Sequence, residues 1–404
     1  MVAGANSSWQ LIDLPSPEAR IPITPARFVG GVLPVCVCSY VMAVLVLVPN
    51  TRHLRILLLA VALALTFNAA TKYDLTGGDP SQAFQNFGHC LCMTSTAMRL
   101  TTWAFISEPL RRTGNSRSIF LDALDLQCNL RGIGWTWGIP AKHLPPETRP
   151  THSKSAFLLA TVARLIQIVF IYDALNNIAR YCTPSVGSTP SEATIFDPAL
   201  PPVQRYALSS FVSVLYGAVF YHTIELVYYL ATIAALMIPG LDQQPSDWPT
   251  FSRPPWLATS LADYWGRRWH QSNRHAYVTL SYPFVVLFGR AGLILGAFFW
   301  SAVLHAVGVW GMGLGIDFTS TGGFFMLMGA GVTLEECYKS FTGRKIDGFS
   351  GWLWTISFMV VGGNLLVDCW IKTGLFSGEV LPPFAQPVTI GLRYLATAAP
   401  LQAT

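Results

Sequence analysis

The chain has 404 residues, of which 52% are hydrophobic and only 12% are charged, and it contains 24 Phe, 14 Tyr and 13 Trp. Soluble domains carry about a quarter charged residues, so this composition predicts an integral membrane protein. The formal net charge of +5 is small for this length, and the basic residues lie between apolar segments. That pattern suits anionic headgroups or a phosphorylated cofactor and argues against a nucleic-acid partner.

Residues 1–27 read as a polar N-terminal tail rich in Pro and Ser. They lack the cationic stretch, short apolar core and cleavage site of a secretory signal peptide. We therefore expect the first apolar segment to remain in the product as a signal anchor.

The apolar segments predict an all-α, multi-pass membrane bundle of about eight helices in one domain over residues 28–372. A spanning helix needs about 20 mostly apolar residues. One segment is too long for an upright span, so we expect it to tilt strongly or to break near Gly217. Another, 277–288, is short and could be re-entrant. In chain order the segments are 28–48, 54–70, 156–179, 207–238, 277–288, 291–312, 322–333 and 351–371.

The connections and the tail complete this expected layout. Residues 71–154 are mixed in character, and we expect membrane-surface helices and loops there. Residues 373–404 form a C-terminal tail that we expect to lie along the interface. The paired cysteines Cys36/Cys38 and Cys90/Cys92 are spaced i,i+2, so on a helix they point apart and form no two-ligand metal face. We assign no metal ligand.

The block Asp-Tyr-Trp-Gly-Arg-Arg-Trp-His-Gln at 263–271 combines aromatic and cationic residues. On a helix Trp265 and Trp269 share one face, while Arg267 and Arg268 project to other sides. This pattern is typical of an interfacial segment with an aromatic anchor and a cationic rim. From the pattern alone, membrane anchoring is a sufficient explanation.

A second histidine, His305, lies in the middle of an apolar segment of bilayer length, where a titratable group is costly. Small residues crowd its helix, so His305 should face protein or a cavity and not lipid. Burial disfavours the imidazolium form and leaves a neutral ring that can accept a proton, as a general base must. The alternative is a structural histidine that hydrogen-bonds across a helix interface. The small residues are Gly292, Gly296, Gly308, Gly311, Gly313 and Gly315.

Together these motifs resemble the membrane-bound O-acyltransferases, and more narrowly their wax synthase branch. In that branch a block like 263–271 precedes an intramembrane histidine by some 35 residues, as it does here. Residues 131–137, Arg-Gly-Ile-Gly-Trp-Thr-Trp, resemble a motif of fungal members. The resemblance is specific over 131–137 and 263–309 and diffuse elsewhere.

The resemblance implies roles for both histidines. His305 would be the catalytic base and His270 its partner, in a central tunnel through the membrane where an acyl-CoA thioester meets an alcohol. No Ser or Cys stands in a nucleophile-elbow motif, and no covalent acyl-enzyme is required. At the tunnel mouth, coenzyme A phosphates would meet a cationic and aromatic set; lipid headgroups are the alternative partners. This set is Arg267, Arg268, Arg274, Trp265 and Trp269.

The resemblance also suggests substrates. Fungal members with these motifs resemble acetyltransferases that esterify terpenoids and other secondary metabolites, so we expect an acetyl-CoA-dependent O-acetyltransferase of the endoplasmic reticulum membrane. Esterification of long-chain alcohols is the alternative within the family. From another class, a multi-pass transporter could use the polar groups within apolar segments as a path. Those groups are Arg164, Asp173, His222, Glu225 and His305.

Overall fold

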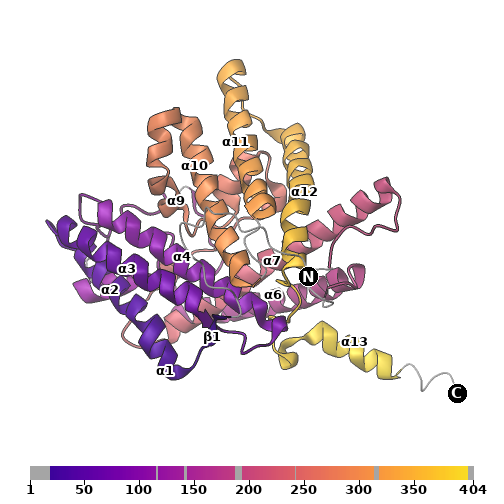
Figure 1. Cartoon of the computed structure of the whole chain (residues 1–404), viewed down its shortest axis with the longest axis horizontal. Helices are drawn as coiled ribbons and strands as arrows, with labels where there is room; N and C mark the ends of the chain where they lie inside the picture. Colours follow the sequence, from indigo (N-terminus) through magenta and orange to yellow (C-terminus); the bar gives the residue numbers. More distant parts are fainter. Residues whose placement is uncertain are drawn as a thin grey trace.

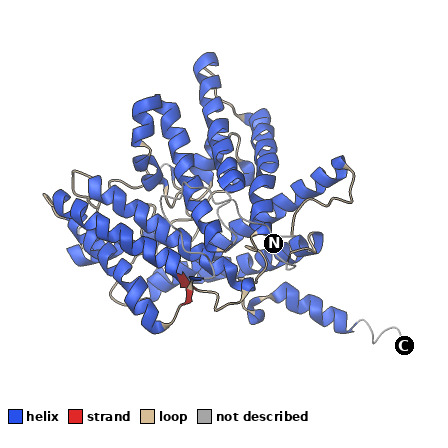
Figure 2. Ribbon diagram, in the orientation of Figure 1, coloured by secondary structure: helices blue, strands red, loops and turns tan. Residues whose placement is uncertain are grey.

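The computed structural model describes residues 19–114, 117–140, 143–186, 193–241, 243–313 and 318–398. Within these ranges the molecule is almost wholly helical (Figure 2), and its one sheet is a parallel pair of two-residue strands, β1 (Ile21–Pro22) and β2 (Tyr73–Asp74). The predicted all-α multi-pass class is confirmed. The first 18 residues of the expected N-terminal tail, and Gly315 of the small-residue set, lie outside the described residues.

Six helices in the described ranges are long and apolar enough to cross a membrane, so the expected number of about eight is not confirmed. Large apolar side chains such as Leu57 and Leu159 are exposed on their outer faces. A lipid environment accounts for this exposure. The six are the N-terminal helix Pro25–Leu47, which combines α1 (Pro25–Arg27), a wide π turn (Phe28–Val32) and α2 (Leu33–Leu47), then α3 (Arg52–Lys72), α6 (Lys154–Cys182), α7 (Pro202–Met237), α10 (Tyr282–Gly311) and α12 (Gly348–Lys372).

The remaining elements connect or flank these helices. Two of them, α4 (Ala83–Phe105) and α11 (Gly323–Thr342), have 20 residues or more. The other helices are α5 (Ile119–Cys128), α8 (Leu261–Asp263), α9 (Arg274–Leu280) and α13 (Pro387–Ala398). The turns are π turns at Tyr264–Arg268 and Phe318–Gly322 and 3₁₀ turns at Pro80–Gln82, Pro245–Asp247, Pro255–Leu257 and Pro383–Ala385.

Two segments complete the sequence-based expectation. Of the two alternatives for 207–238, the break near Gly217 does not occur: α7 is continuous over 36 residues, because one glycine costs a helix only about 1 kcal/mol and α7 packs along α6 and α12. The strong tilt stays a prediction. The apolar stretch 277–288 is divided between two helices. Helix α9 ends before Ser281, and α10 continues through a kink at Gly289, whose φ of 57° and ψ of −132° are open to glycine.

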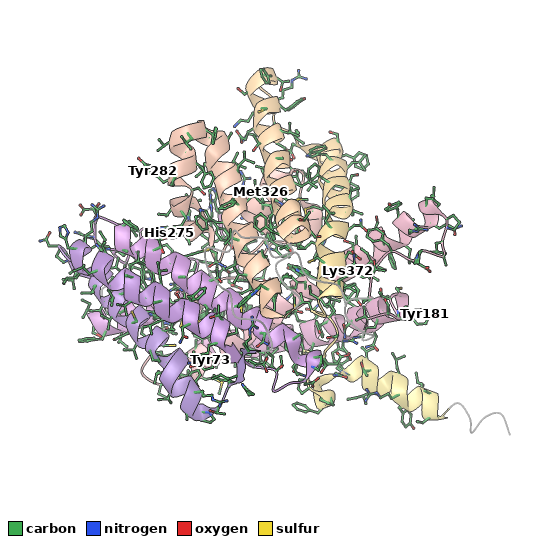
Figure 3. The ribbon with its side chains drawn as sticks, viewed as in Figure 1. Tyr73, Tyr181, His275, Tyr282, Met326 and Lys372 are labelled. Atoms are coloured by element: carbon green, nitrogen blue, oxygen red, sulfur yellow. The ribbon has the colours of Figure 1, made fainter. Side chains whose placement is uncertain are left out.

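The helices form two neighbouring groups (Figure 1). In one group α2, α3 and α4 lie side by side; in the other α10, α11 and α12 do, with α6 and α7 beside them. Helix α10 joins the groups, because it packs against α4 and also against α11 and α9. Figure 3 labels His275 and Tyr282 on the α9–α10 hairpin and Met326 on α11.

The C-terminal helix α13 lies apart from the two groups in Figure 1 and contacts α6. Its first turn is fixed by Asp173 on α6, whose carboxylate accepts the backbone N–H groups of Val388 at 2.8 Å and Thr389 at 3.0 Å. Asn177 donates to the same carboxylate at 3.2 Å. Asp173 and Asn177 therefore belong to a structural network that holds the tail.

Candidate functional site

A cavity of about 680 Å³ lies between α7, α10, α11, α12 and the segment that runs from residue 255 to residue 278. Its lining is mostly apolar and aromatic, and a few polar side chains converge on it. Both His270 and His305 are among the lining residues. Pockets of this size and character are where small-molecule sites usually form. The cavity is therefore the candidate site.

His305 lines this cavity from the C-terminal third of α10. Its Nδ1 lies 2.8 Å from the carbonyl oxygen of Ser301, one helical turn earlier. A carbonyl oxygen can only accept, so Nδ1 carries the hydrogen, and Nε2 of the neutral ring keeps its lone pair. The imidazole also stacks on the Phe325 ring, with centroids 4.4 Å apart and planes at 29°. His305 therefore offers a proton acceptor from a fixed ring.

The small residues of α10 bring it against its neighbours, as the sequence indicated. A Cβ at Gly308 would stand 2.8 Å from the Phe87 ring, and one at Gly311 would stand 2.7 Å from the Cys90 sulfur; both of those contacts are on α4. Within α10 itself, a Cβ at Gly292 would fall 1.9 Å from the carbonyl oxygen of Phe284, which lies on the other side of the kink at Gly289. Close approach of this kind is the usual reason for such residues in membrane helices.

The segment 261–271 is not the regular α-helix that its spacing suggested. After the short α8, residues 264–268 form a π turn, and Trp269 turns extended with φ −67° and ψ 156°. The backbone N–H of Trp269 donates to the Tyr264 carbonyl at 2.8 Å, and the Gln271 amide donates to the Trp265 and Trp269 carbonyls, both at 2.8 Å. These bonds satisfy backbone groups at the end of the wide turn.

His270 follows this turn and lines the cavity. Its ring lies parallel to the Phe251 ring, with centroids 5.9 Å apart and planes at 8°, and beside Trp269 at 5.4 Å. Its Nδ1 is buried and has no hydrogen-bond partner among the described residues. Burial, with smaller effects from nearby His305 and Arg131, lowers the pKa of His270 to about 3. The ring is therefore neutral at physiological pH.

The expected cationic and aromatic set is only partly gathered at the cavity. Trp265 and Trp269 line it, with ring centroids 6.0 Å apart, and so does Arg274 at the start of α9. Arg268 does not line it; it forms an ion pair with Asp263. Arg267 is exposed and also lies outside the lining. A coenzyme A role for Arg267 and Arg268 stays a prediction.

Sequence reasoning missed several residues of the site. Phe325 on α11 and Phe251 before the 263–271 block face the two histidines, and Arg290 on α10 forms an ion pair of 3.0 Å with Glu336 at the cavity wall. No motif marks these positions, because each acquires its role through a partner far away in sequence. Neither His222 nor Glu225, both weaker candidates, lines the cavity.

Comparison with known proteins finds a family match over the segment that carries both histidines. The Membrane bound O-acyl transferase family matches residues 248–327, a segment that includes both histidines and most of the cavity wall on α10. The resemblance drawn from the motifs is thereby confirmed. No solved structure matches the chain.

Several curated proteins are similar to the chain. Acetyltransferase spyB of Aspergillus fumigatus is 26% identical over 60% of this chain and 42% of its own length. O-Mevalon transferase yanI of Aspergillus niger is 26% identical over 62% of this chain and 57% of its own length. A long-chain-alcohol O-fatty-acyltransferase of Simmondsia chinensis is 31% identical over 41% of this chain and 49% of its own length. The chain thus spans about half the length of these relatives.

Proposed function

Starting from the match of residues 248–327 to the membrane-bound O-acyl transferases, we propose that this integral membrane protein is an acyl-CoA-dependent O-acyltransferase. The observation that carries the proposal is the convergence of His305 and His270 on one apolar cavity, where the bond from His305 Nδ1 to the Ser301 carbonyl leaves Nε2 of a neutral ring to accept a proton. An alcohol is a poor nucleophile until a base removes its proton during attack, and a positioned imidazole supplies that base.

In the proposed reaction His305 is the base. Its Nε2 takes the proton of the acceptor hydroxyl while the alcohol oxygen attacks the thioester carbonyl carbon. The C–S bond then breaks, and the thiolate of coenzyme A leaves with the proton from His305, so the ester and free coenzyme A are the products. His270, neutral and beside His305, orients the reacting oxygen or polarises the carbonyl.

We further propose that the donor is acetyl-CoA and the acceptor a hydroxyl of a terpenoid or another secondary metabolite. One of the relatives just named is called an acetyltransferase, which supports a short acyl group. The cavity volume of about 680 Å³ suits a polycyclic acceptor. Arg274 would meet phosphate oxygens of coenzyme A. We assign the protein to the endoplasmic reticulum membrane, which co-fractionation with a marker of that membrane tests.

A second candidate is transfer of a fatty acyl group to a long-chain alcohol, because the 31% identical relative has that name. Purified protein given either labelled acetyl-CoA or palmitoyl-CoA, each with a polycyclic terpenoid alcohol or a fatty alcohol, separates the two. Acetyl ester of the terpenoid is the expected product. Turnover of palmitoyl-CoA with the fatty alcohol alone would establish the second candidate instead, and solute flux without any ester would establish a transporter.

The mechanism is tested with His305→Ala, which we expect to lower kcat by a factor of about 10² to 10⁴. His222→Ala is a matched control: His222 also lies in a long apolar helix and also places Nδ1 2.8 Å from a carbonyl one turn earlier, that of Ala218, but it lies outside the cavity lining. Undiminished transfer by His305→Ala, with His222→Ala equally active, would refute the assignment of the base.

A further inference from the structure

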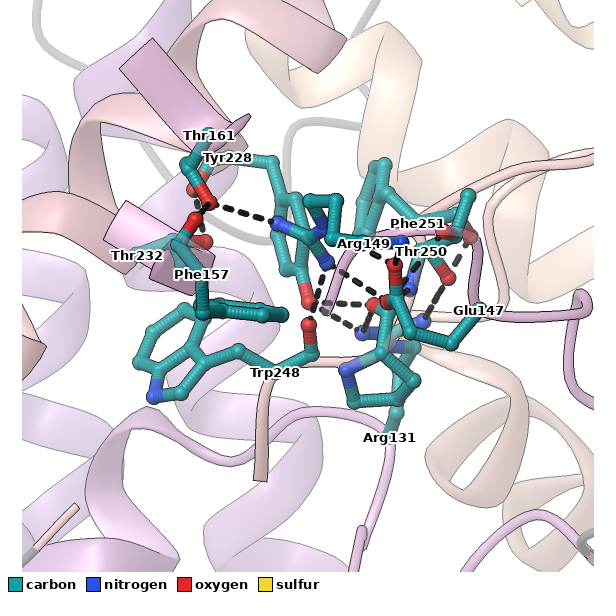
Figure 4. Close-up of polar contacts among 11 residues, drawn as sticks. Arg131, Glu147, Arg149, Phe157, Thr161, Tyr228, Thr232, Trp248, Thr250 and Phe251 are labelled. Carbon is teal, nitrogen blue, oxygen red and sulfur yellow. Dashed lines mark hydrogen bonds and ion pairs between the residues drawn. The ribbon is translucent and has the colours of Figure 1, made fainter. Parts of the chain in front are cut away.

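Arg131, the first residue of the Arg-Gly-Ile-Gly-Trp motif, does not line the cavity, yet it is only 6% exposed. Its guanidinium donates to the carbonyl oxygens of Pro249 at 2.9 Å and Thr250 at 3.0 Å, and to the Tyr228 hydroxyl at 2.6 Å (Figure 4). A fixed fork of donors matches several acceptors at once in a way that a lysine cannot. Arg131 therefore holds the 249–250 turn.

Two further side chains hold the same turn. Glu147 accepts the backbone N–H of Thr250 at 2.8 Å, and Arg149 donates to the carbonyl of Trp248 at 2.7 Å. Glu147 and Arg149 also pair with each other at 2.7 Å, as Figure 4 shows. The backbone of residues 248–250 is thus tied by three side chains to the 131–149 stretch, which lies more than 90 residues earlier in the chain.

The turn ends in a stack of rings that leads to the cavity. The Phe251 ring lies on the Tyr228 ring, with centroids 4.4 Å apart and planes at 20°. Its other neighbour is the His270 ring, parallel to within 8°. The Arg131 guanidinium carbon stands 5.0 Å from the Tyr228 ring centre and 5.2 Å from that of Phe251. One arginine therefore fixes both the backbone and the ring of Phe251.

We propose that Arg131 is a positioning residue that sets the orientation of the His270 imidazole through Phe251. A histidine in a working site usually has its ring oriented by a hydrogen bond to one nitrogen. Nδ1 of His270 has no such partner among the described residues, so the flat face of Phe251 takes over that role. Only the kinetic part of the following test rests on the proposed function.

The kinetic test compares three variants with the wild type. Phe251→Leu keeps an apolar side chain but removes the ring, and Arg131→Lys keeps the charge but not the forked set of donors. We expect each variant to lower kcat about tenfold, because a small misplacement of a catalytic group costs about that much. KM should stay within about a factor of two of the wild-type value. Phe251→Tyr restores a ring and should restore kcat. Equal kcat for Phe251→Leu and the wild type would overturn the proposal.

Arg205→Lys is the matched control for a purely structural effect. Arg205 also donates to three carbonyls of one turn, those of Asp197, Pro198 and Leu200. Unlike Arg131, it does not lie against a ring that is parallel to the His270 ring. If Arg131→Lys lowered kcat no more than Arg205→Lys at an equal loss of Tm, Arg131 would be merely structural and the proposal would fail.

A second measurement does not depend on acyl transfer. Diethyl pyrocarbonate acylates exposed imidazole nitrogens, and peptide mass spectrometry reports the rate at His270 relative to the exposed His53. We expect faster labelling of His270 in Arg131→Lys and Phe251→Leu, and wild-type labelling in Phe251→Tyr and Arg205→Lys. Unchanged labelling in both of the first two would overturn the inference even in a protein that transfers no acyl group, whereas changed labelling without activity would contradict the proposed function alone.

Discussion

The Glu335 carboxylate on α11 accepts the backbone N–H of Leu261 at 2.6 Å, although the two residues are 74 positions apart. The same carboxylate accepts the N–H of Ala262 at 2.9 Å and the indole N–H of Trp354 at 2.9 Å. These two backbone donors begin the segment that ends in His270. One buried acid thus fixes the start of the segment and joins it to α11 and α12.

Glu335→Gln should destabilise the protein by about 1–3 kcal/mol, because the new amide turns an N–H₂ group toward a buried backbone donor. The measurement is Tm in detergent by tryptophan fluorescence. The matched control is Glu336→Gln, the same change at the next residue, whose exposed pair with Arg290 should be worth less than about 1 kcal/mol. Equal losses of Tm in the two variants would contradict the role of Glu335.

Acid should destabilise the fold through His270. Its folded pKa of about 3 lies below the ordinary value near 6.5, so between these pH values the unfolded chain holds a proton that the folded chain lacks. The stabilisation is complete above pH 6.5 and falls by about 1.4 kcal/mol per pH unit below it. We expect His270→Gln to lose less Tm than the wild type between pH 7 and pH 5, and the exposed-site variant His53→Gln to behave like the wild type.

Gly311→Ala should destabilise the protein by about 1–3 kcal/mol, because its Cβ would stand 2.7 Å from the Cys90 sulfur and 2.9 Å from the Asn86 carbonyl oxygen. Gly88→Ala on α4 is the control, for which we expect a change of Tm in the opposite direction. No atom lies within 4 Å of a Cβ at Gly88, and alanine favours a helix over glycine by about 1 kcal/mol, so Tm should rise. A fall of Tm in both variants would argue against close packing of α10 on α4 as the cause.

Arg274→Gln should raise KM for acyl-CoA about tenfold, if this exposed arginine at the cavity binds phosphate oxygens, since charge-assisted hydrogen bonds are worth about 1.5–3 kcal/mol. KM for the alcohol should not change. Arg267→Gln on the same segment should have the smaller effect, because Arg267 lies outside the lining. Steady-state kinetics at low and moderate salt measure both, and a larger effect at Arg267 would place the phosphates elsewhere.

Hydrophobic patterning predicted much of the fold. The segment 156–179 became α6, Lys154–Cys182, and 54–70 became α3, Arg52–Lys72, because length and apolar content alone determine such helices. Patterning was insufficient where the path of a helix depended on the conformation of a single glycine. It left open whether 207–238 tilts or breaks at Gly217, where no break occurs. It also did not predict the kink at Gly289, where the φ of 57° depends on packing that no local pattern records.

Some residues of the site could likewise be predicted from the sequence and others could not. The two histidines were found from their setting and motif, and both line one cavity. The spacing of Trp265 and Trp269 placed them together, although it suggested an α-helix where the chain forms a π turn. Phe251 was not found, because its neighbours Arg131 and Tyr228 come from distant parts of the chain.

The contacts of the 248–250 turn define which part of the chain could be exchanged between relatives. The family match begins at residue 248, but the side chains that hold this turn belong to residues 131, 147 and 149. A chimaera that received residues 248–327 alone would inherit both histidines without the supports of the loop that faces one of them. A transplant that keeps these supports is therefore discontinuous: besides 248–327 it needs the 131–149 stretch, and also Tyr228 and Glu335, which contact the same segment.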